Sequence, residues 1–421
     1  MIRRILKNED WLSFTAGLLL ILLSIAGVKF GATKFSWATS EDLVVLLSSP
    51  TNLLSIGLTA VVMIILGLAT KVLQQKQTYT IFISILLLFI VSLLSQFISG
   101  FKPVKYYGFE YVIFALLLGI LIRSVFGLPK WLAVNLHTEF FVKTGLVILG
   151  ASVIFGDILS AGSLGLIQAL VVVLAVWFFA FWVGGKLRID DDLKLMLASA
   201  VSICGVSAAI ATAGAINGDS KKLSYVVSLV LIVALPMLIL MPLAATWMNL
   251  NPAQAGAWLG GTIDTTGAVV ASGSILGEVA LKYSTIVKFS QNVLIGFAAV
   301  GISVFWAFKN KKSDGTSEKQ EVNFKLIWDR FPKFVLGFMI ASLIYSFFIT
   351  PDTLTQTKDY LKGLQTALFA LAFVSIGLET DFSVLIKTGN GRPAWTFLIA
   401  QAFNIVFTIV IAWFLFANIK V

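Results

Sequence analysis

The feature that most constrains this fold is a succession of long apolar stretches separated by short polar ones. A helix needs about 20 apolar residues to cross the hydrocarbon core of a bilayer. About thirteen such stretches fit into the 421 residues, and little chain is left between them. Because a spanning segment must satisfy its own backbone hydrogen bonds, stretches of this length are read as helices. The sequence therefore predicts an all-α polytopic membrane protein.

We expect about thirteen transmembrane helices at roughly 11–27, 52–71, 79–99, 109–126, 138–155, 163–185, 192–216, 222–248, 253–274, 281–308, 331–350, 361–379 and 393–418. A signal peptide is the alternative for the first stretch, but its length and the lack of a small-residue cleavage site favour a span. The predicted division is into extra N-terminal helices (1–107), a first inverted repeat (108–248) and a second one (249–421). A polar loop from Lys309 to Glu321 interrupts the second repeat.

The composition excludes several classes of function. Only 12% of the residues are charged, about half the share found in soluble proteins. One Cys and one His rule out a disulfide framework and the usual zinc ligand sets, so no metal or cofactor is expected. No catalytic fingerprint, ATP-binding loop or basic nucleic-acid patch occurs, so we expect a non-enzyme that binds no nucleic acid and whose partner is the lipid bilayer.

Basic residues predict the orientation. With a cytoplasmic N-terminus, most Lys and Arg residues fall on the cytoplasmic side, as the positive-inside rule requires. We therefore expect a multi-pass protein of the bacterial inner (cytoplasmic) membrane, with the Lys309–Glu321 loop inside and Val421 outside. The oligomeric state stays open, with a homodimer as one option.

Two pairs of stretches match each other about 225 residues apart. Residues 119–129 align with 341–351, and 149–159 align with 376–386. The matched spans are seven apart, and an odd separation gives the two copies opposite orientations in the membrane. Inverted repeats of this kind are typical of secondary transporters, whose sites lie near the midplane.

Small polar residues and glycines interrupt two of the predicted spans. They lie in 198–212, around Ser202, Cys204, Gly205 and Ser207, and in 260–273, which contains one Asp, three Thr and four Gly. Close packing between helices is the alternative explanation, but packing requires neither an Asp nor so many Thr. We expect helix breaks near Cys204–Gly205 and within Gly260–Gly267, facing each other as discontinuous crossed helices.

Two charged residues fall inside predicted spans. An intramembrane carboxylate such as Asp264 is a functional hypothesis by default. Lys288, in the next span, is its natural counter-charge, and the alternative is that this side chain extends to the interface. Gln291 and Asn292 follow one turn later and are expected to line the same cavity. Unless it is paired, Asp264 is expected to bind Na⁺ or H⁺.

At these segments the chain resembles the putative sulfate exporter family of bacterial membrane proteins, within the superfamily of cation/proton antiporters and anion transporters. Ser202-Ile203-Cys204-Gly205 match the family motif, and Lys288 falls on the Lys of a later motif. Asp264 and Thr265 replace a His-Glu pair, and Gln291 stands where an Arg is usual. The resemblance covers roughly 108–418. It implies two inverted five-helix repeats with crossed discontinuous helices, alternating access and a sulfate- or sulfonate-like substrate.

Residues and resemblance together predict a secondary active transporter that exports or exchanges a small anion. A monovalent cation/proton antiporter that uses Asp264, with Asp381 as a further candidate, is the first alternative, and a non-transporting scaffold or sensor is the second. H⁺ or Na⁺ is the expected coupling ion. The predicted binding residues are Ser202, Cys204, Gly205, Ser207, Thr262, Asp264, Thr265, Thr266, Gly267, Lys288, Gln291 and Asn292.

Overall fold

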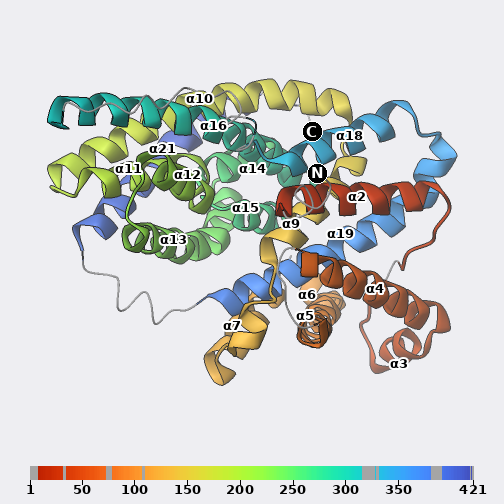
Figure 1. Ribbon diagram of the computed structural model, residues 1–421. Coiled ribbons are helices and arrows are strands. Elements are labelled where there is room, and N and C mark those ends of the chain that lie inside the picture. The colour runs from red at the N-terminus through yellow and green to blue at the C-terminus, as the bar shows by residue number, and fades with distance from the viewer. Residues whose placement is uncertain are drawn as a thin grey trace. The chain divides into compact units, whose positions relative to one another are not determined.

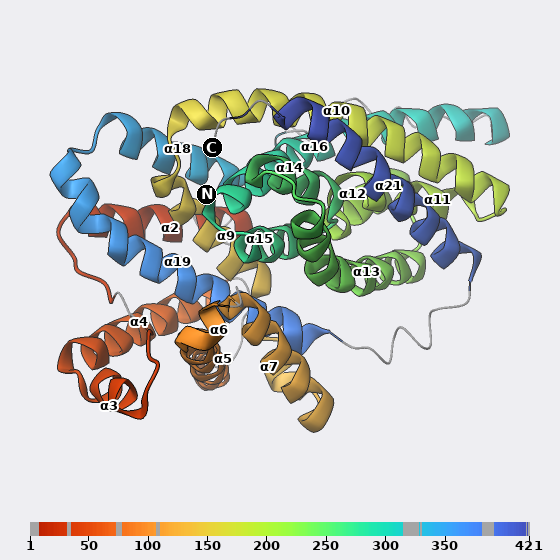
Figure 2. The ribbon, with the colours of Figure 1, turned by 180° about the vertical axis from the view of Figure 1, so that it is seen from behind.

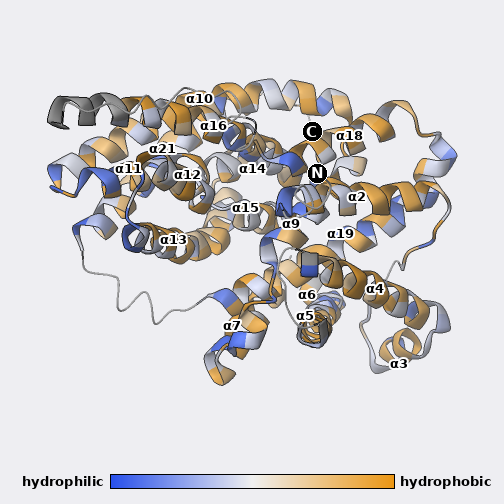
Figure 3. Ribbon diagram, in the orientation of Figure 1, coloured by the Kyte–Doolittle hydropathy of each residue, from blue (hydrophilic) through white to orange (hydrophobic). Residues whose placement is uncertain are grey.

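In the residues that the computed structural model describes, the regular secondary structure is helical, apart from one isolated bridge between Trp37 and Phe101 (Figure 1). It describes residues 8–31, 35–72, 78–106, 110–314, 328, 331–380, 391–417 and 419. Within these residues, eight helices are long and apolar enough to cross a membrane, and shorter apolar helices accompany them. Hydrophobic residues dominate the helices (Figure 3). The predicted all-α polytopic membrane fold is confirmed.

The chain forms two compact units, which we call unit 1 (residues 1–158 and 333–380) and unit 2 (residues 159–332 and 381–421). These units group segments differently from the predicted repeats, which stay a prediction. The helices of unit 1 are α2 (Glu9–Ile25), α3 (Ser40–Ser48), α4 (Pro50–Ala69), α5 (Thr78–Ser99), α6 (Lys102–Tyr106), α7 (Tyr111–Phe126), α8 (Lys130–Ala133), α9 (Thr138–Leu149), α18 (Lys333–Phe347) and α19 (Pro351–Glu379), with 3₁₀ turns η1 (Thr70–Val72) and η2 (Gly150–Ser152).

Glycines bring pairs of helices in unit 1 into backbone contact. A Cβ at Gly119 of α7 would meet Gly377 of α19, and a Cβ at Gly150 of η2 would meet the carbonyl of Phe338 in α18. Small residues permit this close approach between helices in a membrane. The aligned stretches pair α7 with α18 and α9 with α19, so these are the contacts that an inverted repeat would duplicate.

A buried ammonium group connects α2 to α9. Lys143 Nζ lies 3.0 Å from Asp10 Oδ1 and 3.6 Å from Glu139 Oε2, and it stands over the ring of Phe334. The Asp10 carboxylate also accepts a hydrogen bond from the backbone N–H of Lys333. The first predicted span is thus an integral helix of unit 1.

Unit 2 contains the interrupted segments (Figure 2). Its elements are α10 (Phe155–Lys186, which begins in unit 1), α11 (Asp191–Ser199), the π-helical turn η3 (Ala200–Cys204), α12 (Val206–Ile216), α13 (Ser220–Trp247), α14 (Pro252–Thr262), α15 (Thr266–Ile275), α16 (Glu278–Asp314) and α21 (Arg392–Phe416). The predicted loop from Lys309 therefore begins inside α16, and the part beyond Asp314 lies outside the described residues.

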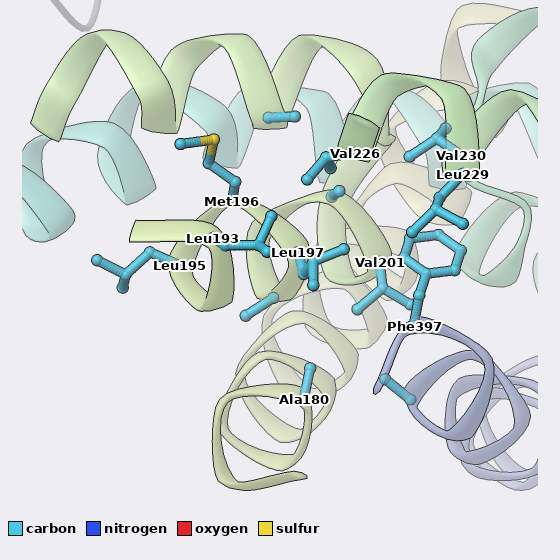
Figure 4. Packing of buried hydrophobic residues seen from close by; sticks show 14 of the residues in the cluster. Ala180, Leu193, Leu195, Met196, Leu197, Val201, Val226, Leu229, Val230 and Phe397 are labelled. Atoms are coloured by element: carbon cyan, nitrogen blue, oxygen red, sulfur yellow. The ribbon is translucent and has the colours of Figure 1, made fainter. Parts of the chain in front are cut away.

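The segment from α11 to α12 folds back on itself, and we call it hairpin 1 (Asp191–Ile216). Met196, in the middle of α11, packs against Gly218, which follows the end of α12. Lys222 Nζ lies 2.8 Å from Asp192 Oδ1, which joins the start of α13 to the start of α11. A straight 26-residue helix would separate its ends by roughly 39 Å, so the chain must reverse near Gly205. Apolar side chains of α10, α13 and α21 pack around α11 and η3 (Figure 4).

The segment from α14 to α15 also reverses, and we call it hairpin 2 (Pro252–Ile275). Gly260 of α14 and Gly273 of α15 both lie against Ser284 of α16. Gly256, one turn before Gly260, lies against Ala280, so α14 runs parallel to α16. α15 runs antiparallel to α16, to which the turn at Gly277 connects it. The two helices of hairpin 2 therefore run in opposite directions along one neighbour.

Both predicted helix breaks are confirmed in position, and the course of the chain through them is corrected. The seventh and ninth predicted spans are hairpins, because at each break the chain turns back instead of continuing across. The open end of hairpin 1 lies at the start of α13, next to Lys222, and that of hairpin 2 follows the end of α13 at Trp247. A helix of 28 residues, about 42 Å long, separates the two open ends.

Candidate functional site

The tip of hairpin 1 is a π-helical turn closed by a glycine. Gly205 has φ +60° and ψ −108°, a conformation that side chains rarely tolerate. A Cβ there would lie 2.5 Å from Val230 Cγ1 of α13 and 3.2 Å from Asp264 Cβ of hairpin 2. The predicted Gly205 is therefore the point at which the two hairpin tips meet.

The tip of hairpin 2 is extended chain between two helix ends. α14 ends at Thr262, and Thr265 caps the N-terminus of α15 by accepting a hydrogen bond from the Ala268 N–H (3.3 Å). Ile263 and Asp264 lie between them, buried in the unit. Asp264 is only 2% exposed and directly precedes this N-cap, so its carboxylate lies near the positive end of α15.

Lys288 of α16 ties the two tips together. Its ammonium group donates to the carbonyl of Ile203 (2.7 Å), the carbonyl of Ile263 (2.8 Å) and Gln291 Oε1 (3.0 Å). The two carbonyls belong to the C-terminal ends of η3 and α14, where acceptors lack intrahelical partners and carry partial negative charge. One buried cation thus satisfies two helix ends. The side chain is 1% exposed, so the alternative that it extends to the membrane surface is wrong.

Asp264 and Lys288 are neighbours without a direct ion pair. The described residues include ion pairs elsewhere, but none joins these two side chains within 4.0 Å. The three ammonium hydrogens of Lys288 already have oxygen acceptors, whereas Asp264 Oδ2 is buried with no hydrogen-bond partner. The expected counter-charge pairing is thereby corrected, because the helix-end carbonyls compete for the ammonium group.

Amide side chains satisfy the remaining carbonyls at the end of α14. Gln291 donates to Gly261 O (2.8 Å), and Gln401 and Asn404 of α21 donate to Thr262 O (3.0 and 3.3 Å). Of these three, only Gln291 was among the predicted residues. Gln401 and Asn404 are buried amides in a largely apolar helix. Two amide side chains within such a helix are the sequence signal that could have identified these residues.

The other predicted residues divide between structural and accessible positions. Ser202 donates to Ala198 O within its own segment (2.7 Å), so its hydroxyl supports the turn. Cys204 is buried at the tip of hairpin 1, whereas Ser207, in the first turn of α12, is exposed. Gly267 is buried within α15.

Thr262, Thr266 and Asn292 belong to the surroundings of hairpin 2. Thr266 receives a 3.4 Å hydrogen bond from Asn292 Nδ2. Asn292 Oδ1 and Thr262 Oγ1 are buried without hydrogen-bond partners. The structure therefore brings the predicted residues of both segments to one place, the meeting point of the tips.

The two hairpins also share a short sequence match. Aligned 60 residues apart, the tips read Ser202-Ile203-Cys204-Gly205 and Thr262-Ile263-Asp264-Thr265. Identical residues recur as Ile203/Ile263, Ala208/Ala268, Ala211/Ala271, Lys222/Lys282, Ser224/Ser284 and Val227/Val287. The sequence analysis missed this match. In this alignment, Ile203 and Ile263, whose carbonyls accept from Lys288, occupy the same position, and Cys204 is aligned with Asp264.

The site offers oxygen ligands and charged groups. In the part of the chain that the structure describes, no group of three or more His, Cys, Asp or Glu side chains is placed to hold a metal ion. The meeting point instead offers one carboxylate, amide and hydroxyl oxygens, and the N-termini of α12 and α15. Such a site can bind and release a small ion.

Comparison with known proteins supports the class that the fold defines, a polytopic membrane protein. The family model described as Conserved hypothetical protein 698 matches residues 83–396. A UPF0324 membrane protein of Rhodopirellula baltica is 38% identical over 78% of this chain and 62% of its own length. Another from Nitratidesulfovibrio vulgaris is 37% identical, covering 78% of this chain and 58% of that protein.

The chain therefore belongs to the UPF0324 membrane protein family, which is the putative sulfate exporter family. It spans about three fifths of the length of these two relatives. A third relative, from Nitrosomonas europaea, is 31% identical over 70% of this chain and 66% of its own length. No solved structure matches the chain.

Proposed function

We propose that the protein is a secondary active transporter in which Asp264 binds and releases the coupling cation, H⁺ or Na⁺. The observation that carries this proposal is the buried Asp264 Oδ2 atom, which has no hydrogen-bond partner at the meeting point of two hairpin tips. An intramembrane carboxylate is costly unless it is neutralised or binds an ion. The carboxylate is thus an ion-binding group, and the predicted antiporter alternative gains support over an anion held by Lys288.

Paired hairpins suit alternating access. α12 and α15 are only 11 and 10 residues long, so each spans roughly half the thickness of a bilayer. Each is the second helix of its hairpin. The two hairpins open toward opposite ends of α13, so each tip is reached from a different side. A small movement of one hairpin relative to α16 would expose Asp264 to one face of the membrane at a time.

A small anion is the second candidate substrate. The N-termini of α12 and α15 both lie at the hairpin tips, and helix N-termini attract negative charge. Ser207 offers an exposed hydroxyl in the first turn of α12. Lys288 is not a ligand in this scheme, because its hydrogens are donated to protein oxygens. The anion would instead compete with the Asp264 carboxylate for the two helix ends, so loading of Asp264 with a cation would favour anion entry.

The hairpins also sharpen the proposed orientation. With the N-terminus inside, a re-entrant hairpin 1 returns the chain to the cytoplasm, which places Lys221 and Lys222 there. Hairpin 2 opens outside, so the side of every later segment is unchanged. Val421 lies outside the described residues, and its position outside the membrane stays a prediction. The basic excess on the cytoplasmic side therefore increases, in agreement with the positive-inside rule. We keep the prediction of a non-enzyme of the bacterial inner membrane.

The test is ion flux in proteoliposomes. Imposed pH and Na⁺ gradients, with and without sulfate or sulfonates, should drive transport by the unmodified protein, and Asp264→Asn should abolish the ion-coupled component. Ser290→Ala is the matched control, because Ser290 is on α16 close to Lys288 and donates only to Ile286 of its own helix. Equal flux in both variants would refute the role of Asp264.

The single cysteine supplies a second test. Cys204 is the only Cys in the sequence and is buried at the tip of hairpin 1. Membrane-impermeant thiol reagents should label it from a side that depends on the imposed ion gradient, with Cys204→Ser as the blank. Labelling that is independent of ions would favour a scaffold or sensor.

A further inference from the structure

Unpartnered oxygen atoms gather around hairpin 2. Asp264 Oδ2, Asn292 Oδ1 and Thr262 Oγ1 are buried, and none has a hydrogen-bond partner. The corresponding hydroxyl of hairpin 1, on Ser202, donates to Ala198 O. A buried acceptor left without a partner destabilises the folded state. A fold that leaves several at one tip therefore provides for a ligand that satisfies them.

Two of these oxygens belong to the region where the turn of hairpin 2 packs against α16. Lys288 and Asn292 are one turn apart on the same face of α16. Lys288 donates to Ile263 O, and Asn292 Nδ2 lies 3.4 Å from Thr266 Oγ1. Asp264 lies between Ile263 and Thr266 in the chain, so it is held between two contacts that the same face of α16 makes with the turn.

The number of oxygens distinguishes a metal ion from a proton. A proton needs one carboxylate oxygen and would leave Asn292 Oδ1 without a partner, whereas a cation can accept electron pairs from several oxygens at once. The charge indicates a monovalent ion, because one carboxylate stands beside one buried ammonium group. Calcium sites instead gather six to eight oxygens, commonly from several carboxylates, and the described residues contain no group of three or more His, Cys, Asp or Glu side chains placed to hold a metal ion.

We propose that hairpin 2 and α16 form a Na⁺ site, in which the Asp264 carboxylate and the Asn292 amide oxygen are the side-chain ligands. The proposal rests on the proposed function, because it names the ion that Asp264 binds and adds Asn292 as a ligand. Bound Na⁺ connects the turn of hairpin 2 to α16, so it should stabilise the folded protein as any ligand specific to the native state does.

The experiment is thermal unfolding of the purified full chain in detergent at fixed pH. NaCl is titrated against choline chloride at constant ionic strength, with KCl, LiCl and CaCl₂ as further arms. Na⁺ should raise the Tm of the unmodified protein in a saturable way, with a smaller rise for K⁺. Asp264→Asn and Asn292→Ala should abolish this shift, while Ser290→Ala should keep it.

Asn292→Ser is a second variant that keeps a hydroxyl oxygen at the same position, in case the alanine variant fails to fold. It should retain a shift that needs more Na⁺ to saturate. No response of the unmodified protein to Na⁺, or a full response by Asn292→Ala, would overturn the Na⁺ site. Those results would leave the proposed function intact if a pH gradient still drives flux through Asp264, whereas loss of dependence on Asp264 would end both.

Discussion

Hairpins 1 and 2 reverse the chain in the same way, but the groups that stabilise their tips differ. Hairpin 1 turns on a glycine and carries no charge at its tip, since Cys204 stands where hairpin 2 has Asp264. Hairpin 2 turns on extended chain, and Thr265 caps the helix that follows. Asp264 belongs to this turn, and Lys288 belongs to the neighbouring helix α16. Hairpin 1 thus offers a turn without a carboxylate, whereas hairpin 2 holds a buried carboxylate close to a buried ammonium group.

The two open ends differ as well. An ion pair between Lys222 and Asp192 fastens hairpin 1 to α13. Hairpin 2 begins with a neutral capping box, in which Asn251 and Gln254 each accept from the other's backbone N–H (2.8 and 3.2 Å). Salt should therefore weaken one open end and not the other.

The largest effect is expected from removing the group that both hairpins share. Lys288→Met leaves the carbonyls of Ile203 and Ile263 buried without a donor and Asp264 without a nearby cation. We expect a loss of about 3–5 kcal/mol of stability, measured by chemical or thermal unfolding. Because the carbonyls remain unsatisfied, adding Asp264→Asn should restore only part of it. Complete recovery would show that the two charges meet directly after all.

The next effect compares the two turns. Gly205→Ala places a Cβ against Val230 in a strained conformation, and we expect a cost of about 3 kcal/mol. At the aligned position in hairpin 2, Thr265→Ala removes only an N-cap, at about 1 kcal/mol. Unfolding curves of the two variants test the order. Equal losses would mean that the tips are interchangeable and that the close contact at Gly205 does not matter.

The open end of hairpin 2 provides a smaller effect. Asn251→Ala removes the cap of α14 and should lower stability by about 1 kcal/mol, by the same amount at low and high salt. The reason is that the capping box involves no charged group. The measurement is Tm at two NaCl concentrations with Na⁺ binding saturated in both, and a loss that changes with salt would argue against a neutral cap.

The smallest effect is expected at the open end of hairpin 1. Lys222→Ala breaks a partly exposed ion pair and should cost less than about 1 kcal/mol, with the loss shrinking as salt rises. Tm differences between variant and unmodified protein over a salt series provide the test. A loss that stays constant with salt would indicate that the aliphatic part of Lys222, rather than its charge, closes the hairpin.

Much of the fold could be predicted from the sequence. Each expected apolar stretch coincides with a helix or a helix pair, because length and hydropathy decide which segments enter a membrane. Clustered glycines and hydroxyl residues, with one carboxylate, located both breaks, since an apolar segment interrupted in this way is typical of a broken helix. Asp264, Lys288, Gln291 and Asn292 were singled out on those grounds, and the structure places them together.

The reversal at the breaks could not be predicted from the same signals. A helix that bends and one that turns back share the same local composition, and the choice rests on contacts such as Met196 with Gly218 and Gly273 with Ser284. The partners of Lys288 were equally hidden, because two of them are backbone carbonyls. Side-chain types carry no information on which carbonyls a fold leaves without an intrahelical donor.

Local hydrophobicity and backbone preference, both readable from the residues, predicted that this chain enters a membrane as helices, where two of them break and which ionisable groups lie at depth. Only the tertiary structure decided that the breaks are hairpin tips and that Lys288 joins them instead of pairing with Asp264. The physical reason is competition for a limited number of donors. The carbonyls of two helix ends come within reach of one ammonium group, and Asp264 is left with a buried oxygen that has no hydrogen-bond partner.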